Sequence, residues 1–316
     1  MFCFFLKNKN TETLNFFFYI QFLLFICFFI LKKLGLVAQG YGFIDSLPAL
    51  YGLWWISPPF IKSLLKARNL SLMVKQGYST IWKNIYEHYQ MNVIFDAQIK
   101  SINRSLEDSY SPISIEVSIN GEVQNMDCDF LIITSPLKES LDFLSDATNE
   151  EKEIFSSLKA STLISTLYRS KVKDSKERAV TYYPDKIAKG HPGRLYAERN
   201  SQLAIYPERP PPTDVRFSIA YQYFESESEK DEDSKILLED LKQLEYEEVE
   251  ILESRTWNYF PRFDQEGLNN RYPWRIIDMQ GTNKTWYAGS SACFESIEDV
   301  ISYNHLLFRI FFDAKD

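Results

Sequence analysis

The chain has 316 residues, of which 45% are hydrophobic and 16% aromatic, and its formal net charge is −8. This length and apolar content can bury the core of about two domains, which excludes a disordered tail. Because a surface that follows nucleic-acid phosphates needs clustered Lys and Arg, we expect no DNA or RNA partner.

The cysteines and histidines are too scattered to indicate a metal site. They are Cys3, Cys27, Cys128, Cys293, His88, His191 and His305. No two of them have the spacing with which a short loop or a helix grips one metal ion, so we expect no metal. The cysteines also lack the density of a disulfide scaffold, which indicates a reducing compartment.

The first 39 residues form a segment of their own. Residues 16–31 (FFFYIQFLLFICFFIL) are apolar, with lysines on both sides. A bilayer-spanning helix needs about 20 apolar residues, a length that is reached only over residues 14–37, past Lys32 and Lys33. Three interpretations stay open: a hydrophobic membrane anchor, a secretory leader, and a stretch foreign to the natural protein. We expect membrane association if the segment is genuine and a cytoplasmic protein otherwise.

Helices are expected next along the chain. Residues 40–59 predict short helices separated by prolines, and residues 60–73 predict a further helix. A turn at residues 76–79 opens a helix that runs to Tyr89, with Ser79 as its N-cap.

A small β-meander follows. We expect short strands at residues 92–95 and 99–103, and then a hairpin of residues 113–119 and 122–126, which Asn120 and Gly121 join with a strong turn signal. The apolar run FLIIT at residues 130–134 predicts a strand that is buried on both faces. Residues 138–158 have helical periodicity.

The middle of the chain predicts a sheet with irregular loops. β-rich runs alternate with prolines over residues 161–223, and residues 225–233 (ESESEKDED) predict a solvated loop. Ser234 is expected to cap a helix that ends near Leu244. Residues 249–257 then predict a strand that leads into the segment WNYFPRF at residues 257–263.

A strand, a glycine turn and a helix follow one another near the C-terminal end. The strand and turn are residues 284–291 (KTWYAGSS), and Ser296 opens a helix. The helix repeats Ile297, Val300, Ile301, Asn304, Leu307, Phe308 and Phe311 at helical spacing. Such a turn before a helix N-terminus suits an anion, although any α/β domain contains turns of this kind.

The stretch WYAGSSACFESIEDVISYN resembles the final cofactor-binding motif of FAD-dependent amine oxidases and related flavin-containing amine oxidoreductases. The order of the expected elements agrees with this family over residues 40–307. The resemblance implies a mixed α/β (α+β) fold, in which a partial FAD-binding Rossmann-like domain with a β-meander accompanies a substrate domain of mixed sheet and helix. The implied division is 1–39 leader or anchor, 40–75 helical part of the substrate domain, 76–137 partial FAD-binding domain, 138–275 substrate domain, and 276–316 C-terminal FAD-binding strand and helix.

The resemblance also implies roles for individual residues. The backbone of Ile99 would lie against the adenine, and Gly289 and Ser290 would face the ribityl and phosphate portion. The cofactor-binding set further includes Glu295, Ser296 and Ile297, the last two through helix amides near the pyrimidine edge of the flavin. Trp257 and Tyr259, with Phe260, are candidates for the substrate pocket, and ordinary core packing is the alternative for these aromatic side chains.

The implied reaction is hydride transfer from a C–N or C–C bond of a small organic substrate to FAD. The sequence has no G-x-G-x-x-G in a strand-turn-helix setting, and Ser290 stands where relatives often carry an acidic residue. We therefore expect an N-terminally incomplete copy whose pyrophosphate site is compromised. The alternatives are a non-catalytic remnant and a membrane-tethered interaction protein that binds no cofactor.

Overall fold

The computed structural model describes residues 40–42, 47–55, 74, 77–106, 110–171, 180–183, 186, 192–200, 215–224 and 233–312. The hydrophobic segment, the helix expected at 60–73 and most of the charge run lie outside these residues. Within the described ranges, no helix is both long enough and apolar enough to cross a bilayer.

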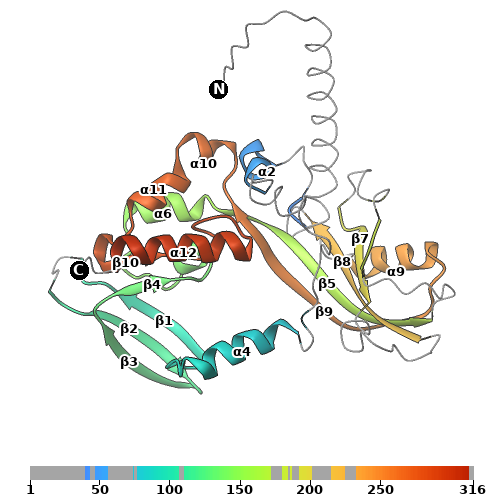
Figure 1. Cartoon of the computed structure of the whole chain (residues 1–316), viewed down its shortest axis with the longest axis horizontal. Coiled ribbons are helices and arrows are strands. Elements are labelled where there is room, and N and C mark those ends of the chain that lie inside the picture. Colours follow the sequence, from blue (N-terminus) through green and yellow to red (C-terminus); the bar gives the residue numbers. More distant parts are fainter. Residues whose placement is uncertain are drawn as a thin grey trace, which may run out of the picture.

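Helices and strands alternate irregularly along the chain (Figure 1). The helices are α2 (Ala49–Trp55), α4 (Tyr78–His88), α5 (Leu137–Ser140), α6 (Asn149–Ser156), α9 (Asp233–Gln243), α10 (Gln265–Asn269), α11 (Tyr272–Asp278) and α12 (Ile297–Phe311), with a 3-10 turn η2 (Thr282–Lys284). The strands are β1 (Ala97–Asn103), β2 (Ile113–Ile119), β3 (Glu122–Cys128), β4 (Leu131–Ile133), β5 (Lys159–Lys171), β6 (Val180–Tyr182), β7 (Leu195–Asn200), β8 (Val215–Phe224), β9 (Glu247–Arg262) and β10 (Thr285–Tyr287).

These strands form three sheets. The strands β1, β2 and β3 make an antiparallel meander, β4 pairs in parallel with β10, and a larger sheet has the order β6-β7-β8-β5-β9. In Figure 1, β5 and β9 run as a long pair from the neighbourhood of α6 and α12 to that of α9. The sheet and helix content agrees with the mixed α/β class that the sequence predicts.

The hairpin between β2 and β3 is confirmed. Asn120 has φ 53° and Gly121 has φ 88°, the positive values that a two-residue turn of this kind requires. In contrast, residues 92–95 are not a strand, because no described strand pairs with them and the ladder begins only at Ala97. The expected cap of α4 is also wrong, since Gly77 occupies the N-cap position and Ser79 lies inside the helix.

Two further predictions are corrected. The helix expected at 138–158 is divided into α5 and α6, because Thr148 and Glu151 form a capping box that starts α6 afresh. The strand of FLIIT is buried on one face alone: Ile133 is 4% exposed, whereas Ile132 is 51% exposed. The reason is that the main core lies against the face of β4 that carries Ile133.

Helix boundaries at the C-terminal end follow the sequence closely. Ser296 caps α12, and its Oγ accepts a hydrogen bond from the backbone N–H of Asp299 at 3.0 Å. The apolar stripe that predicts this helix is largely exposed, since Leu307 is its one buried member. Ser234 does not start α9, because the helix begins at Asp233.

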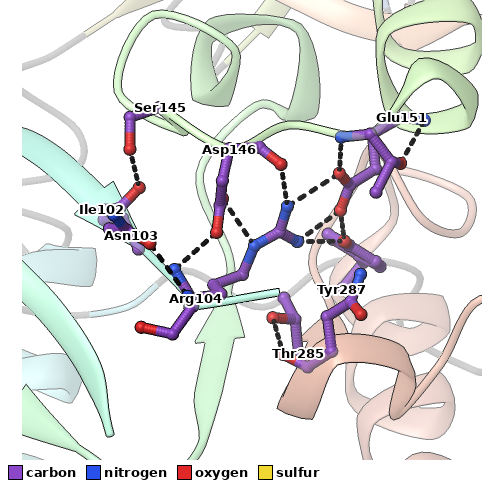
Figure 2. A network of polar contacts seen from close by, with 11 residues as sticks. Ile102, Asn103, Arg104, Ser145, Asp146, Glu151, Thr285 and Tyr287 are labelled. Carbon is purple, nitrogen blue, oxygen red and sulfur yellow. Dashed lines mark hydrogen bonds and ion pairs between the residues drawn. The ribbon is translucent and has the colours of Figure 1, made fainter. Parts of the chain in front are cut away.

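A buried ionic network joins the meander to α6 and β10 (Figure 2). Arg104 follows β1, is 2% exposed, and donates from Nη2 to Oε2 of Glu151 at 2.8 Å and from Nε to Oδ1 of Asp146 at 2.9 Å. The hydroxyl of Tyr287 also donates to Glu151. Burial alone acts to raise the pKa of Glu151, but the hydrogen bonds from Arg104 and Tyr287 outweigh it and hold the pKa below its usual value. The network fixes three segments that are remote in sequence.

Candidate functional site

A cavity of about 970 Å³ lies where β9 ends, β5 begins and the turn after β10 leads toward α12. Its remaining wall comes from α5 and the residues on either side of that helix, and from Ser156 at the end of α6 and Leu158 after it. It is lined by Pro136, Lys138, Glu139, Leu141, Asp142, Ser156, Leu158, Lys159, Ala160, Thr162, Asn258, Tyr259, Pro261, Arg262, Ser290, Ser291 and Glu295. A volume of this size is at the upper end of the range for small-molecule sites.

The parallel pairing of β10 with β4 positions the glycine turn beside this cavity. The backbone N–H of Ala288 donates to the carbonyl oxygen of Ile133 at 2.9 Å, which extends the ladder by one residue. Gly289 then has φ 83°, and a Cβ there would lie 2.8 Å from the carbonyl oxygen of Thr134. Glycine is therefore required at this point, and the chain leaves the turn with Ser290 and Ser291 at the cavity wall.

A β-bulge in β9 shapes the opposite wall. Ser161 pairs with Tyr259 and Lys159 with Arg262, so β9 has two residues, Phe260 and Pro261, where β5 has one. Residues three apart on a regular strand point to opposite faces, but the extra residue brings the side chains of Tyr259 and Arg262 to the same cavity. The Nη1 of Arg262 donates to Oγ of Ser161 at 2.6 Å, which holds the guanidinium there.

Phe260, in the bulge, has a backbone conformation that is rare for a bulky residue. Its φ is 56°, in the left-handed region. The ring is 1% exposed and packs with Tyr41 and Phe294 in an aromatic cluster that also contains Leu47 and Tyr51. This cluster stabilises the bulge.

Among the carboxyl groups that line the cavity, Glu295 has the pKa that departs most from its ordinary value. It lines the cavity together with Tyr259. Burial raises the pKa of Glu295 to about 7, because the neighbouring polar groups of Tyr259 and Phe260 and the charge of Arg262 offset only part of the desolvation. Burial and the neighbouring Glu295 also raise the pKa of Tyr259, so that phenol stays protonated.

The stack of Tyr259 on Tyr41 completes this wall. The two rings are nearly parallel, with an interplanar angle of 7° and centroids 6.0 Å apart. Gly40, which precedes Tyr41, has φ 80°, and a Cβ there would meet the hydroxyl of Tyr196 at 3.0 Å and the ring of Tyr259 at 3.3 Å. The close approach of this backbone thus holds the Tyr259 ring in place.

The structure brings some of the predicted site residues together and separates others. Tyr259, Ser290 and Glu295 line the cavity, and Gly289 lies directly beside it. Trp257 is 47% exposed on β9, where its indole N–H donates to Oγ of Ser165 at 2.9 Å, and it does not line the cavity. The other predicted residues also lie outside the lining: Ile99 on β1, Phe260 in the aromatic cluster, Ser296 at the cap of α12, and Ile297 at its first turn.

Sequence reasoning missed several cavity residues. Arg262 belongs to the WNYFPRF segment, but strand periodicity gives no sign of the bulge that turns its side chain into the cavity. Lys159 and Asp142 carry no motif. Among the missed residues, Ser291 could have been predicted to line the cavity, because it lies in the glycine turn that the sequence indicates.

The sequence matches no protein-family model and no curated protein sequence. Its structure is similar to the CLA-producing fatty acid isomerase from P. acnes, with a TM-score of 0.68 and 21% identity over 87% of this chain and 61% of that chain. It is also similar to reduced UDP-galactopyranose mutase, with a TM-score of 0.53 and 11% identity over 75% of this chain and 52% of that one. The similarity to putrescine oxidase is lower, with a TM-score of 0.44 and 13% identity over 75% of this chain and 52% of that one.

These likenesses establish the fold. The mixed α/β class expected from the sequence is confirmed. The chain spans less than two thirds of the length of the isomerase and about half that of the mutase.

Proposed function

We propose that this chain binds FAD beside the glycine turn and acts as a flavin-dependent oxidoreductase of amine-oxidase type. The observation that carries the proposal is the cavity itself, at which the turn after β10 and the bulge of β9 meet. The resemblance of residues 286–304 to a flavin motif supports the proposal, because the glycine turn of that segment lies at this cavity, and the similarity of the fold to those of the isomerase and the mutase is consistent with it.

The residues present fit the ring end of the cofactor. Because a Cβ on Gly289 would meet the backbone of Thr134, the turn is held close to β4, and Ser290 and Ser291 present polar groups to a cavity of ring-binding size. We propose that Ser290, Ser291 and Glu295 border the flavin ring, and that Gly289 keeps the backbone clear of it. The roles predicted for Ile99, Ser296 and Ile297 are part of the same proposal.

The described residues offer no comparable place for the pyrophosphate. The first turn of α12 carries Glu298 and Asp299, and its cap is already formed by Ser296, so an anion is disfavoured there. We therefore assign no phosphate contact within the described part of the chain.

A bound flavin would supply the two-electron chemistry, as acceptor of a hydride. The chain's own residues bind and orient the substrate. The ring of Tyr259, fixed by Tyr41, forms an apolar wall, and Arg262 is held facing the cavity by Ser161. Lys159 is engaged with Asp264 at 2.7 Å, which reduces its availability for a ligand. Arg262 is thus the better placed cation to orient a polar substrate.

The test is flavin uptake by the full-length chain. The protein is purified, its absorbance between 350 and 500 nm is recorded, and it is titrated with FAD and with riboflavin while flavin fluorescence is followed. We expect saturable binding of both, because riboflavin retains the ring. Colourless, folded protein that binds neither would favour the non-catalytic remnant or the interaction protein and would reject the proposal.

Turnover then separates two kinds of redox chemistry. An oxidase consumes oxygen as it oxidises its substrate, whereas the two neighbours with the higher TM-scores are named as an isomerase and a mutase. Oxygen consumption with small amines supports the amine-oxidase type. Substrate conversion without oxygen uptake in flavin-loaded protein would replace it with a redox-neutral isomerisation.

A further inference from the structure

We infer that Arg262 binds a carboxylate group of the ligand that occupies the cavity, and that Ser161 is its positioning residue. As a statement about the substrate, this inference rests on the proposed function, and it deepens that function by naming the substrate class. The substrate is a small organic molecule that carries one carboxylate on an apolar body. The sequence resemblance gives Arg262 and Ser161 no role.

The guanidinium of Arg262 is fixed through one of its nitrogen atoms. Its Nη1 donates to Oγ of Ser161 at 2.6 Å and to the carbonyl oxygen of Phe260 at 3.3 Å. Ser161 is 1% exposed, and its Oγ also hydrogen-bonds with the hydroxyl of Tyr223 at 3.0 Å. Tyr223 lies on β8, Ser161 on β5 and Arg262 at the end of β9, which are neighbouring strands of one sheet (Figure 1). Because the side chain is held in advance, a ligand that binds it loses little affinity to the ordering of a flexible group.

The other two nitrogen atoms of this guanidinium are available to a ligand. Within the described residues, Nε and Nη2 of Arg262 have no hydrogen-bond partner, and no carboxylate oxygen lies within 4.0 Å of the group. Nε and Nη2 form one edge of the planar group, and such an edge matches the two oxygens of a carboxylate. Arg104 provides the contrast, because Asp146 and Glu151 already accept from its Nε and Nη2. Arg262 therefore keeps an unpaired edge in the wall of a cavity.

The charges of the cavity wall favour one carboxylate over a phosphate. The lining carries the carboxyl groups of Glu139, Asp142 and Glu295 and the cations of Lys138, Lys159 and Arg262. Lys159 is paired with Asp264 at 2.7 Å, so two cations remain beside three carboxyl groups. Glu295 interacts with Arg262 through its charge but lies beyond ion-pair distance, so it leaves the guanidinium edge unpaired. A dianion would be repelled by these carboxyl groups, whereas a monoanion needs only the one edge that Arg262 offers.

Apolar side chains make up much of the remaining wall. They are Pro136, Leu141, Leu158, Ala160 and Pro261, together with the ring of Tyr259. A cavity of about 970 Å³ with such a wall suits a ligand whose body is apolar and whose orientation is set by a few polar contacts. Together with the guanidinium edge, this wall favours an aromatic or aliphatic monocarboxylate over a sugar or an inorganic anion.

Binding of an acid and of its amide to the full-length protein tests the inference without any turnover. Phenylacetate and phenylacetamide share one apolar ring and differ in charge, and their dissociation constants are measured by isothermal titration calorimetry. We expect phenylacetate to bind about tenfold more tightly or better, because its carboxylate accepts two charge-assisted hydrogen bonds. Equal affinities for the two compounds, or no binding of phenylacetate, overturn the inference.

Variants of the arginine locate the site. We expect Arg262→Gln to weaken phenylacetate binding by about tenfold and to leave phenylacetamide binding within about twofold of wild type. Arg262→Lys keeps the charge, loses the paired donors and should give an intermediate affinity, and it carries the comparison if the glutamine variant does not fold. Arg255→Gln is the matched control, because Arg255 is an exposed arginine of the same strand that pairs with Glu253. Phenylacetate affinity that is unchanged in the Arg262 variants, or that falls equally in Arg255→Gln, overturns the assignment.

The positioning role of Ser161 has its own readout. Ser161→Ala removes the acceptor that holds Nη1, so we expect it to lower the affinity for phenylacetate about threefold while the affinity for phenylacetamide stays unchanged. An equal fall in both affinities would show that Ser161 acts through the fold of the cavity and would overturn its positioning role.

Riboflavin uptake by the same preparations separates this inference from the proposed function. Riboflavin binding without a preference for phenylacetate defeats the carboxylate assignment alone. A preference for phenylacetate that depends on Arg262, in protein that takes up no riboflavin, defeats the flavin proposal and retains Arg262 as the carboxylate-binding residue of the cavity.

Discussion

A Cβ placed on Gly289 would lie 2.8 Å from the carbonyl oxygen of Thr134, closer than real Cβ contacts come. These two residues lie just beyond the ends of the parallel strands β10 and β4, so their approach sets the turn from which Ser290 and Ser291 reach the cavity. The relationship can be tested without any knowledge of the ligand.

We predict that Gly289→Ala destabilises the protein more than Gly121→Ala. Both glycines have positive φ, 83° and 88°, so both substitutions incur a similar backbone strain of about 1 kcal/mol. Gly121 has open space around its Cα, whereas Gly289 faces backbone that cannot move aside freely. We expect an additional cost of about 1–3 kcal/mol at Gly289, measured by urea unfolding. Equal losses in the two variants would show that the approach to Thr134 is not tight.

Removal of the buried guanidinium should be strongly destabilising. Arg104→Met leaves the carboxylate of Glu151 buried without its cation, which costs about 3–5 kcal/mol. The matched control is Arg169→Met, because Arg169 pairs with Glu250 at 2.6 Å with both side chains about half exposed, and such pairs contribute about 0–1 kcal/mol. Urea midpoints that fall equally in the two variants would contradict the structural role of the Arg104 network.

The same network predicts a loss of stability in acid. The pKa of Glu151 is lower in the folded chain than in the unfolded chain, so the unfolded state binds more protons as the pH falls. The stabilisation is present above about pH 4.3, the ordinary glutamate value, and disappears as the pH falls through the lower folded value. We expect the difference in unfolding free energy between wild type and Glu151→Gln to shrink from pH 6 to pH 3. A difference that is constant over this range would refute the prediction.

Glu295 should give a pH dependence of the opposite sign. Burial raises its pKa to about 7 in the folded chain, so between about pH 4.3 and 7 the native state binds more protons than the unfolded state and stability falls as the pH rises. Glu295→Gln keeps the shape and removes the charge. We expect this variant to match wild type near pH 4 and to be more stable at pH 8, by an amount on the order of 3 kcal/mol. Thermal unfolding at the two pH values measures it, and a variant no more stable at pH 8 would contradict the burial of this charge.

Trp257 and Tyr259 should differ in their effect on ligand binding. Trp257 lies outside the cavity and bonds Ser165, while Tyr259 forms the cavity wall. We predict that Trp257→Phe leaves the dissociation constant for riboflavin within about threefold of wild type and that Tyr259→Ala weakens binding by about tenfold or more, through loss of an aromatic contact worth about 1 kcal/mol or more. A larger loss of riboflavin affinity in Trp257→Phe than in Tyr259→Ala would contradict this prediction and would show that Trp257 contacts the ligand.

Features that depend on neighbours in sequence could be predicted. Asn120 and Gly121 specify the hairpin because both residue types tolerate positive φ, and Ser296 specifies the start of α12 because its hydroxyl reaches an amide three residues on. The break between α5 and α6 was also visible in principle, since Thr148 and Glu151 have the spacing of a capping box. The helical periodicity of residues 138–158 instead predicts one continuous helix.

The sequence by itself thus determined the local elements, the mixed class of the fold and the glycine turn, since these follow from backbone preferences and short-range hydrogen bonds. Only the tertiary structure decided that Glu295 meets Tyr259, that a bulge turns Arg262 into the same cavity, and that Arg104 is buried against Glu151. The physical reason is that burial and charge pairing depend on which distant segments pack together, and these in turn set the pKa of each group.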